Sequence, residues 1–165
     1  MYLLDANVFT QARKQYYPFE NFQGFWDWLD DEQTNGVLAS IQMVDRELLD
    51  GDDQLIAWTK ERQQVGWFLP VDDEMTQLKF REVADWTMSQ FPYTWPNQTK
   101  FLKGADPWLI AKAAAMGAVV VTQETFDPNA NSHKVKIPNV CHAFDVRCLN
   151  TLDMIRELHV KFVRG

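Results

Sequence analysis

The chain has 165 residues, of which 46% are hydrophobic, and it carries a formal net charge of −7. This length suits a single α/β domain over residues 1–165, and the hydrophobic content excludes a disordered chain. No apolar stretch is long enough to span a bilayer, and no basic region leads into an apolar segment near residue 1, so we expect a cytoplasmic protein without membrane association.

Apolar segments bounded by turn residues predict strands that alternate with helices along the chain. Pro18 is expected to start an aromatic-rich helix, Asn35-Gly36 marks a turn, and Ser40 is the expected cap of the helix that carries Glu47. From the N-terminus, the expected elements are strand 2–4, a helix from near residue 7, helix 19–32, strand 37–40, a helix from residue 41, a further helix to about residue 65, and strand 67–69.

The C-terminal half continues this alternation. Pro92, Pro96 and Gly104 mark residues 91–104 as a loop, and the polar stretch 127–133 is expected to loop out. The remaining expected elements are helices 73–89, 107–116 and 151–159, and strands 118–122 and 140–144. Because strands alternating with helices imply parallel pairing, we expect an α/β fold, a three-layer α/β/α sandwich with a central, mostly parallel sheet.

Acidic residues stand at the ends of two expected strands. Asp5 follows an apolar run, and Glu124 follows another that ends at Thr122. In a parallel sheet both belong in the crevice outside the carboxyl ends of the strands, where ligands bind. Taken alone, Asp5 would better suit a turn cap. Several carboxylates that converge on one point need a cation, and Mg²⁺ prefers oxygen ligands.

Two further acids lie at expected helices. Asp106 precedes a proline, which matches a helix N-cap, although a cap uses only some of the lone pairs of a carboxylate and leaves others for a metal. On the helix from residue 41, Asp45 and Glu47 both border apolar positions, and periodicity does not choose between them. Thr122 and Glu124 lie two residues apart in extended chain, so their side chains point the same way.

Four segments carry these acids in a characteristic order: Leu4-Asp5-Ala6-Asn7-Val8, Glu47-Leu48, Ala105-Asp106-Pro107-Trp108-Leu109-Ile110-Ala111 and Val121-Thr122-Gln123-Glu124. The order resembles the PIN domain, a family of metal-dependent nucleases, over nearly the whole chain. In that family an acid follows the first strand, a second lies on a helix before an aliphatic residue, a third opens a helix, and a Thr-x-acid segment follows a strand. The resemblance favours Glu47 over Asp45 and points to a divergent PIN-like subgroup.

The resemblance implies a ribonuclease that uses Mg²⁺ or Mn²⁺. Its catalytic metal ligands would be Asp5, Glu47, Asp106 and Glu124, with Asn7 and Thr122 orienting ligands or water. It also implies a toxin of a toxin–antitoxin pair, with an antitoxin protein as partner and a homodimer as assembly. The fourth acid of the family is commonly Asp, so Asp127 competes with Glu124. The alternative function is a PIN-fold module that binds nucleic acid or protein without cleaving.

The negative net charge counts modestly against general nucleic-acid binding, because affinity for a polyanion usually rests on a basic surface. Acids collected in a metal site would account for part of the excess. Five lysines form a candidate phosphate track, with solvated surface residues as the commoner alternative: Lys100, Lys103, Lys112, Lys134 and Lys136.

Cysteine and tryptophan positions add two smaller expectations. Cys141 and Cys148 lack the spacing of a zinc site, so idle thiols are the leading interpretation and a disulfide is the alternative. Most tryptophans are expected in the core or an interface. Trp95, in the expected loop before Asp106, is kept as a candidate substrate contact through base stacking.

Overall fold

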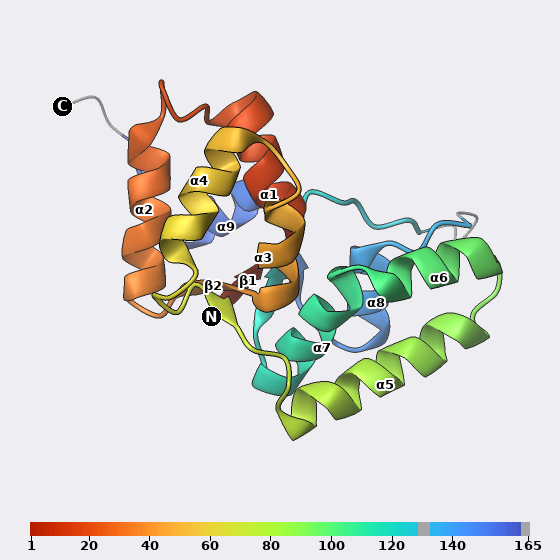
Figure 1. Ribbon diagram of the computed structural model, residues 1–165. Helices are drawn as coiled ribbons and strands as arrows, with labels where there is room; N and C mark the ends of the chain where they lie inside the picture. The colour runs from red at the N-terminus through yellow and green to blue at the C-terminus, as the bar shows by residue number, and fades with distance from the viewer. Residues whose placement is uncertain (129–132, 163–165) are drawn as a thin grey trace.

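A parallel sheet forms the centre of the molecule, of which the computed structural model describes residues 1–128 and 133–162. Within these residues five strands lie in the order β3-β2-β1-β4-β5, and every neighbouring pair is parallel. The strands are β1 (Tyr2–Leu4), β2 (Leu38–Ile41), β3 (Phe68–Leu69), β4 (Val119–Val121) and β5 (Cys148–Leu149). Helices cover both faces of the sheet (Figure 1), so the expected three-layer α/β/α sandwich is confirmed.

Strand β1 occupies the middle of the sheet. Leu3 pairs with Ala39 of β2 on one side and with Val120 of β4 on the other. Because all strands run in the same direction, their carboxyl ends meet at one edge, which we call the carboxyl edge. The residues that leave the strands there include Asp5 after β1 and Thr122 after β4. The sheet therefore brings together residues that are far apart in the sequence.

The helices are divided between the two faces of the sheet (Figure 1). On one side lie α1 (Ala6–Gln11), which continues as a π-helical turn, η1 (Ala12–Tyr16), together with α2 (Gln23–Thr34), α4 (Asp53–Arg62) and α9 (Thr151–Glu157). On the other lie α5 (Glu74–Ser89), α6 (Trp95–Lys103), α7 (Asp106–Met116) and α8 (Ile137–Ala143). The short helix α3 (Gln42–Leu48) follows β2 and contacts α1 and β3.

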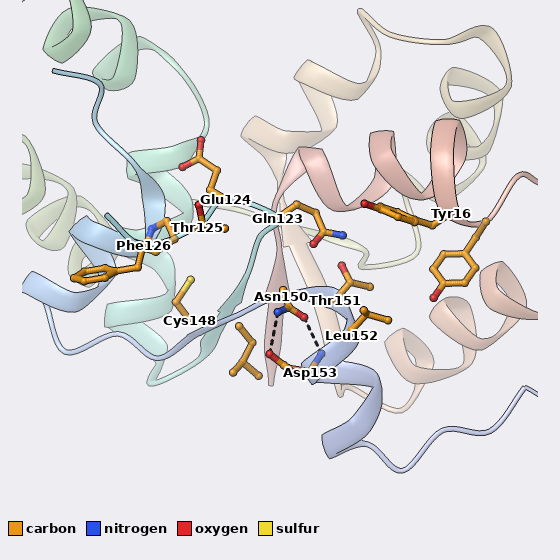
Figure 2. A pocket seen from close by; sticks show the side chains of 13 residues that line it. Tyr16, Gln123, Glu124, Thr125, Phe126, Cys148, Asn150, Thr151, Leu152 and Asp153 are labelled. Atoms are coloured by element: carbon orange, nitrogen blue, oxygen red, sulfur yellow. Dashed lines mark hydrogen bonds between the residues drawn. The ribbon is translucent and has the colours of Figure 1, made fainter. Parts of the chain in front are cut away.

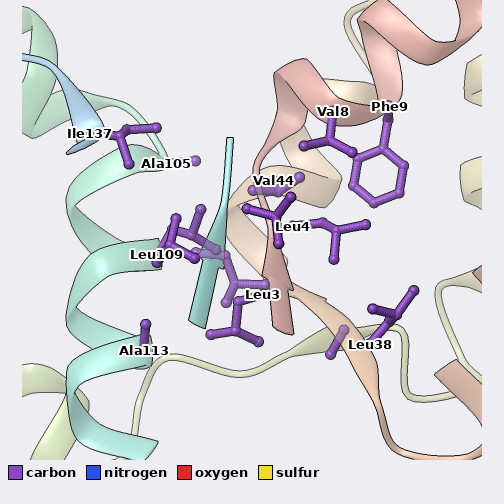
Figure 3. Close-up of a cluster of buried hydrophobic side chains, with 14 of the residues drawn as sticks. Leu3, Leu4, Val8, Phe9, Leu38, Val44, Ala105, Leu109, Ala113 and Ile137 are labelled. Carbon is purple, nitrogen blue, oxygen red and sulfur yellow. The ribbon is translucent and has the colours of Figure 1, made fainter. Parts of the chain in front are cut away.

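The core is apolar and rich in aromatic rings. Figure 3 shows side chains of β1 packed among those of α1 and α7. Under the first helical layer, the ring centroid of Trp58 lies 5.4 Å from that of Trp67 and 5.5 Å from that of Phe9. Trp26 is buried in the same cluster, with its ring 5.3 Å from Trp58. These contacts confirm that tryptophans belong mainly to the core, where large rings contribute most of the buried area.

Two element predictions were wrong, and in both places a proline stands in the first turn of a helix. Residues 91–104 were expected to form a loop, but α6 begins at Trp95 with Pro96 in its first turn. The strand expected at 140–144 is part of α8, with Pro138 in its first turn, and the last strand is β5. Proline is tolerated in the first turn because its missing N–H removes no helical hydrogen bond there. Here each proline starts a helix rather than excluding one.

Smaller differences concern helix starts. Ser40 does not cap α3; its hydroxyl donates a 2.6 Å hydrogen bond to the carbonyl of Leu4 and so links β2 to β1. The helix expected at 19–32 begins at Gln23, because the N–H groups of Asn21 and Phe22 bond the Pro18 carbonyl in a preceding turn. Of the loop expected at 127–133, residues 129–132 lie outside the described part. None of the helices described above combines the length and apolarity needed to cross a bilayer.

Candidate metal centre

Asp5 is the most buried acid at the carboxyl edge. It follows β1 with extended backbone, and its N–H donates a 2.9 Å hydrogen bond to the carbonyl of Val121. This bond continues the pairing of β1 with β4 by one residue and holds the side chain in place. The residue is 3% exposed, and its Oδ2 atom accepts a hydrogen bond of 2.9 Å from the Thr122 hydroxyl. Asp5 is therefore a buried carboxyl supported by one neighbouring hydroxyl.

Thr122 and Asn7 support this carboxyl as a connected pair. The Thr122 hydroxyl donates to Asp5 and accepts from the Asn7 amide at 3.1 Å and from the backbone N–H of Glu124 at 3.2 Å. The Asn7 oxygen accepts the N–H of Gln123 at 2.9 Å. These bonds tie the start of α1 to the chain that follows β4. Both residues thus lie beside Asp5, the position expected of groups that orient a ligand.

Glu47 links α3 to the start of α7. Its Oε1 atom accepts a 2.9 Å hydrogen bond from the backbone N–H of Ala105, the residue before Asp106. Asp45, the other candidate on this helix, instead accepts from the side chain of Gln63 at 3.0 and 3.1 Å. The two acids point to different neighbours, and Glu47 is the one that reaches the segment carrying Asp106.

Asp106 is not the helix cap that the sequence suggested. It is the first residue of α7, Ala105 occupies the N-cap position, and no side chain caps this helix. Among the described residues the Asp106 carboxyl finds no hydrogen-bond partner. Its pKa is raised to about 8, mainly by burial and further by the carboxylates of Asp5, Glu124 and Glu47. All of its oxygen lone pairs therefore remain open to a ligand.

The pKa of Asp5 reflects the same convergence of acids. Burial raises it to about 7, the hydrogen bond from Thr122 acts in the opposite direction, and the nearby carboxylates of Glu124 and Glu47 raise it further. Asp106 thus experiences the charges of the other three predicted ligands, and Asp5 those of Glu124 and Glu47. This repulsion indicates that the carboxylates lie near one another at the carboxyl edge.

Glu124, rather than Asp127, belongs to this group of interacting charges. Its Oε2 atom accepts a 2.8 Å hydrogen bond from the backbone N–H of Ile137, and Lys134 lies 3.7 Å from Oε1. The backbone of Asp127 is bonded in both directions to the Asn139 side chain at 3.0 and 2.9 Å. The charge of Glu124 raises the pKa of both Asp5 and Asp106.

The donor set fits a hard divalent cation in its chemistry. Carboxylate oxygens are the ligands that Mg²⁺ and Mn²⁺ prefer, and a cation would offset the repulsion felt by Asp5 and Asp106. Within residues 1–128 and 133–162, however, no three His, Cys, Asp or Glu side chains lie close enough to hold one ion together. Glu47 and Glu124 each bond a backbone N–H instead. The described carboxylates therefore lie near one another without forming a complete ligand set for one ion.

Three further predictions concern a lysine, a tryptophan and the two cysteines outside this group of acids. Lys112 is not part of a phosphate track, because its Nζ atom forms a 2.6 Å ion pair with Asp73 at the start of α5. Trp95 is 68% exposed at the first residue of α6, a full helix length from the α7 terminus that carries Asp106. Cys141 and Cys148 are both free thiols, in agreement with the leading expectation.

Comparison with known proteins adds a family and a fold. Residues 2–162 match the family described as Domain of unknown function (DUF4411). The chain belongs to this family. No curated protein matches the DUF4411 chain significantly. Among solved structures, it is similar to the crystal structure of FitAcB from Neisseria gonorrhoeae, with 20% identity, 91% of this chain and 97% of that chain covered, and a TM-score of 0.54. The likeness extends to the fold, which is PIN-like.

Sequence reasoning missed a second set of residues at the carboxyl edge of this DUF4411 chain. Because β5 was expected at 140–144, the segment after Leu149 was not recognised as leaving a strand. It includes Asn150 and Thr151, which line a pocket beside Glu124. The available signal was the Asn-Thr pair at the start of the final helix, since Asn150 caps α9 by accepting the N–H of Asp153 at 2.9 Å.

Proposed function

We propose that this protein is a metal-dependent ribonuclease whose ions are held by Asp5, Glu47, Asp106 and Glu124. The observation that carries the proposal is the grouping of these acids at the carboxyl edge, where burial first, and the neighbouring carboxylates in addition, raise the pKa of Asp5 to about 7 and that of Asp106 to about 8. Acids whose pKa values are strongly raised by burial and by neighbouring charges are typical of functional sites. The PIN-like fold and the order of the acids in the sequence support the same conclusion.

The surroundings of each residue would determine its role in metal binding. Asp5 and Asp106, the two acids with raised pKa values, would provide the central ligands. Thr122 and Asn7 would keep Asp5 oriented through the hydrogen bonds described above. When bound, Mg²⁺ or Mn²⁺ would polarise the scissile phosphate and lower the pKa of a water molecule. Glu47 and Glu124 would then turn from their backbone N–H partners toward the ion.

RNA as substrate and an antitoxin as partner follow from the PIN resemblance. Small PIN proteins of this kind are expected to be toxins whose nuclease site is blocked by a second protein. The net charge of −7 and the grouped carboxylates would suit a basic inhibitory segment. A homodimer is proposed on the same resemblance.

A non-catalytic binding module is the second candidate, and one observation favours it. Glu47 and Glu124 both accept backbone N–H groups, which gives each a structural role without any metal. In that case the acids would hold α3, α7 and α8 at the carboxyl edge, and the protein would bind nucleic acid or another protein without cleaving it.

Cleavage of RNA by purified protein separates the two candidates. Wild type, Asp5→Asn and Asp106→Asn would be incubated with structured and unstructured RNAs and Mn²⁺, with Asp72→Asn as the matched exposed-acid control. The nuclease proposal predicts cleavage by wild type and Asp72→Asn and loss of at least about 100-fold in the other two variants. Equal cleavage by all four proteins would identify a contaminant, and no cleavage by folded, Mn²⁺-loaded wild type would favour the binding module.

A further inference from the structure

A pocket of about 510 Å³ opens at the carboxyl edge beside Glu124 (Figure 2). It lies where the chain leaves β4 and β5, and it reaches the π-helical turn η1 on the other side. Gln123 and Glu124 form the boundary that it shares with the candidate metal centre. A ligand in this pocket would therefore lie directly next to the grouped carboxylates.

The hydroxyl of Thr151 is an unsatisfied polar group at the pocket wall. Thr151 is 3% exposed, and within the described residues its Oγ1 atom has no hydrogen-bond partner. Figure 2 shows its side chain projecting toward that of Gln123, which also lines the pocket. A buried hydroxyl without a partner is costly, whereas the same hydroxyl can bond a ligand that enters the pocket. The two side chains together offer donors and acceptors.

The walls of the pocket favour a flat, uncharged ligand. Tyr16 and Phe126 project from opposite sides in Figure 2 and remain 52% and 48% exposed. Exposed aromatic rings are stacking platforms for bases. The described lining contains Glu124 and Asp153 but no lysine or arginine, so an isolated phosphate would be repelled. Aromatic walls with a few polar groups match the general form of a small-ligand site.

We propose that this pocket binds one nucleobase of the RNA substrate, next to the phosphate held at the carboxylates, and that Thr151 contacts the edge of that base. The inference rests on the proposed nuclease function and adds a determinant of base preference to it. Tyr16 or Phe126 would stack on the base, while the Thr151 hydroxyl and the Gln123 amide would bond its polar edge. The pocket would thus select where the strand is cut.

Binding of free nucleosides tests the pocket without metal or phosphate. Adenosine, guanosine, cytidine and uridine would be titrated into the protein in EDTA and followed by saturation-transfer NMR, with ribose as the control lacking a base. We expect at least one nucleoside to bind where ribose does not, and Thr151→Val to weaken that binding roughly fivefold to tenfold. Tyr16→Leu, a surface change, should weaken it by a similar factor through lost stacking.

Thr87→Val provides the matched control for Thr151→Val. Thr87 also carries a buried hydroxyl without a partner among the described residues, but it lies in α5 and does not line the pocket. Equal nucleoside binding by the two variants would overturn the inference, as would binding no stronger than that of ribose.

RNA cleavage distinguishes this inference from the proposed function. If wild type and Thr151→Val cut the same RNA at the same bases, the pocket assignment fails while the nuclease survives. If nucleosides bind through Thr151 but no RNA is cut, the nuclease proposal fails and the pocket is the base site of a protein that binds without cleaving. A changed base preference in Thr151→Val, with cutting retained, identifies the pocket as a site for RNA.

Discussion

The Thr122 hydroxyl donates a 2.9 Å hydrogen bond to Asp5 across 117 positions of sequence. This bond favours the ionised form of a carboxyl whose burial favours the protonated form. Replacing Thr122 by Val keeps the shape and removes the donor, so the pKa of Asp5 should rise above about 7. Carboxyl NMR titration in EDTA measures it, with Thr59→Val as a buried control whose hydroxyl bonds the Leu55 carbonyl. An unchanged pKa would show that the bond has no influence.

The stability of the metal-free protein should fall as the pH rises from about 5 to 8. An acid whose pKa is higher in the folded than in the unfolded state holds its proton more tightly when folded, so ionisation destabilises the fold. The pKa of Asp5 rises from its ordinary value of 3.8 to about 7 in the folded protein, and that of Asp106 rises from 3.8 to about 8. Urea unfolding in EDTA should show Asp5→Asn to be about 1 to 3 kcal/mol more stable than wild type at pH 8. The difference should vanish near pH 4, and a constant difference would contradict the shift.

Mn²⁺ should raise the melting temperature of wild type and have little effect on Asp5→Asn. A ligand that binds only the folded state stabilises it by about 2.7 kcal/mol at 100 times its Kd. The gain should be larger at pH 8 than at pH 6, because the ion competes with protons on Asp5 and Asp106. Thermal melts with MnCl₂ at both pH values provide the measurement. Equal responses of the two proteins would remove Asp5 from the ligand set.

The fourth ligand is predicted to be Glu124 rather than Asp127. Glu124 influences both buried acids, while the backbone of Asp127 is bonded to Asn139 of α8. Glu124→Gln should therefore weaken Mn²⁺ binding about tenfold or more, and Asp127→Asn should change it little. Calorimetric titration of both variants would compare them directly. A larger loss in Asp127→Asn would reverse the assignment and leave the other three acids in place.

Asp73 should contribute to stability independently of any metal. Its carboxylate caps α5 by accepting the Thr76 N–H at 2.9 Å, and it pairs with Lys112 of α7 at 2.6 Å. The hydrogen bond from Lys112 above all, and then those from Thr76, hold its pKa well below the usual range. Asp73→Ala should cost about 1 to 2 kcal/mol in urea unfolding, mainly through the lost cap, because the carboxylate is partly exposed and its ion pair is screened.

The contribution of Asp73 should depend on pH in the opposite direction from that of Asp5. A lowered folded pKa stabilises above the unfolded value of 3.8, and that stability is lost as the pH falls below it. Asp72→Ala, an exposed change one residue earlier, should leave unfolding unchanged. Equal losses in the two variants would indicate a general effect of the loop.

The parallel sheet could be predicted because strand ends carry strong local signals. Apolar runs before Asp5 and Glu124 located β1 and β4, and alternation with helices implied parallel pairing. β5 could not be found in this way, since Cys148 and Leu149 lack the apolar run that marks the equally short β3, and β5 is held by its pairing with β4. Short strands depend on tertiary context more than on propensity.

The candidate site was predictable in residue type but not in conformation. Sequence order suggested Glu47 over Asp45, and the contacts of Glu47 with Ala105 agree with that choice. No pattern in the sequence indicates that Glu47 and Glu124 bond backbone N–H groups, because those donors belong to distant segments brought close by the fold. The N-cap expected at Asp106 was wrong, because Ala105 occupies the N-cap position and Asp106 is the first residue of α7.

The central position of β1 has a consequence for synthesis on the ribosome. Its first neighbour, β2, is made early, but β4 follows some 80 residues after it, so a nascent chain holds Asp5 without its Thr122 partner until most of the protein has emerged. Chains that terminate prematurely, before residue 119, lack one flank of the central strand and the hydroxyl that supports its acid. On the proposed nuclease function, such incomplete translation products would lack activity toward RNA.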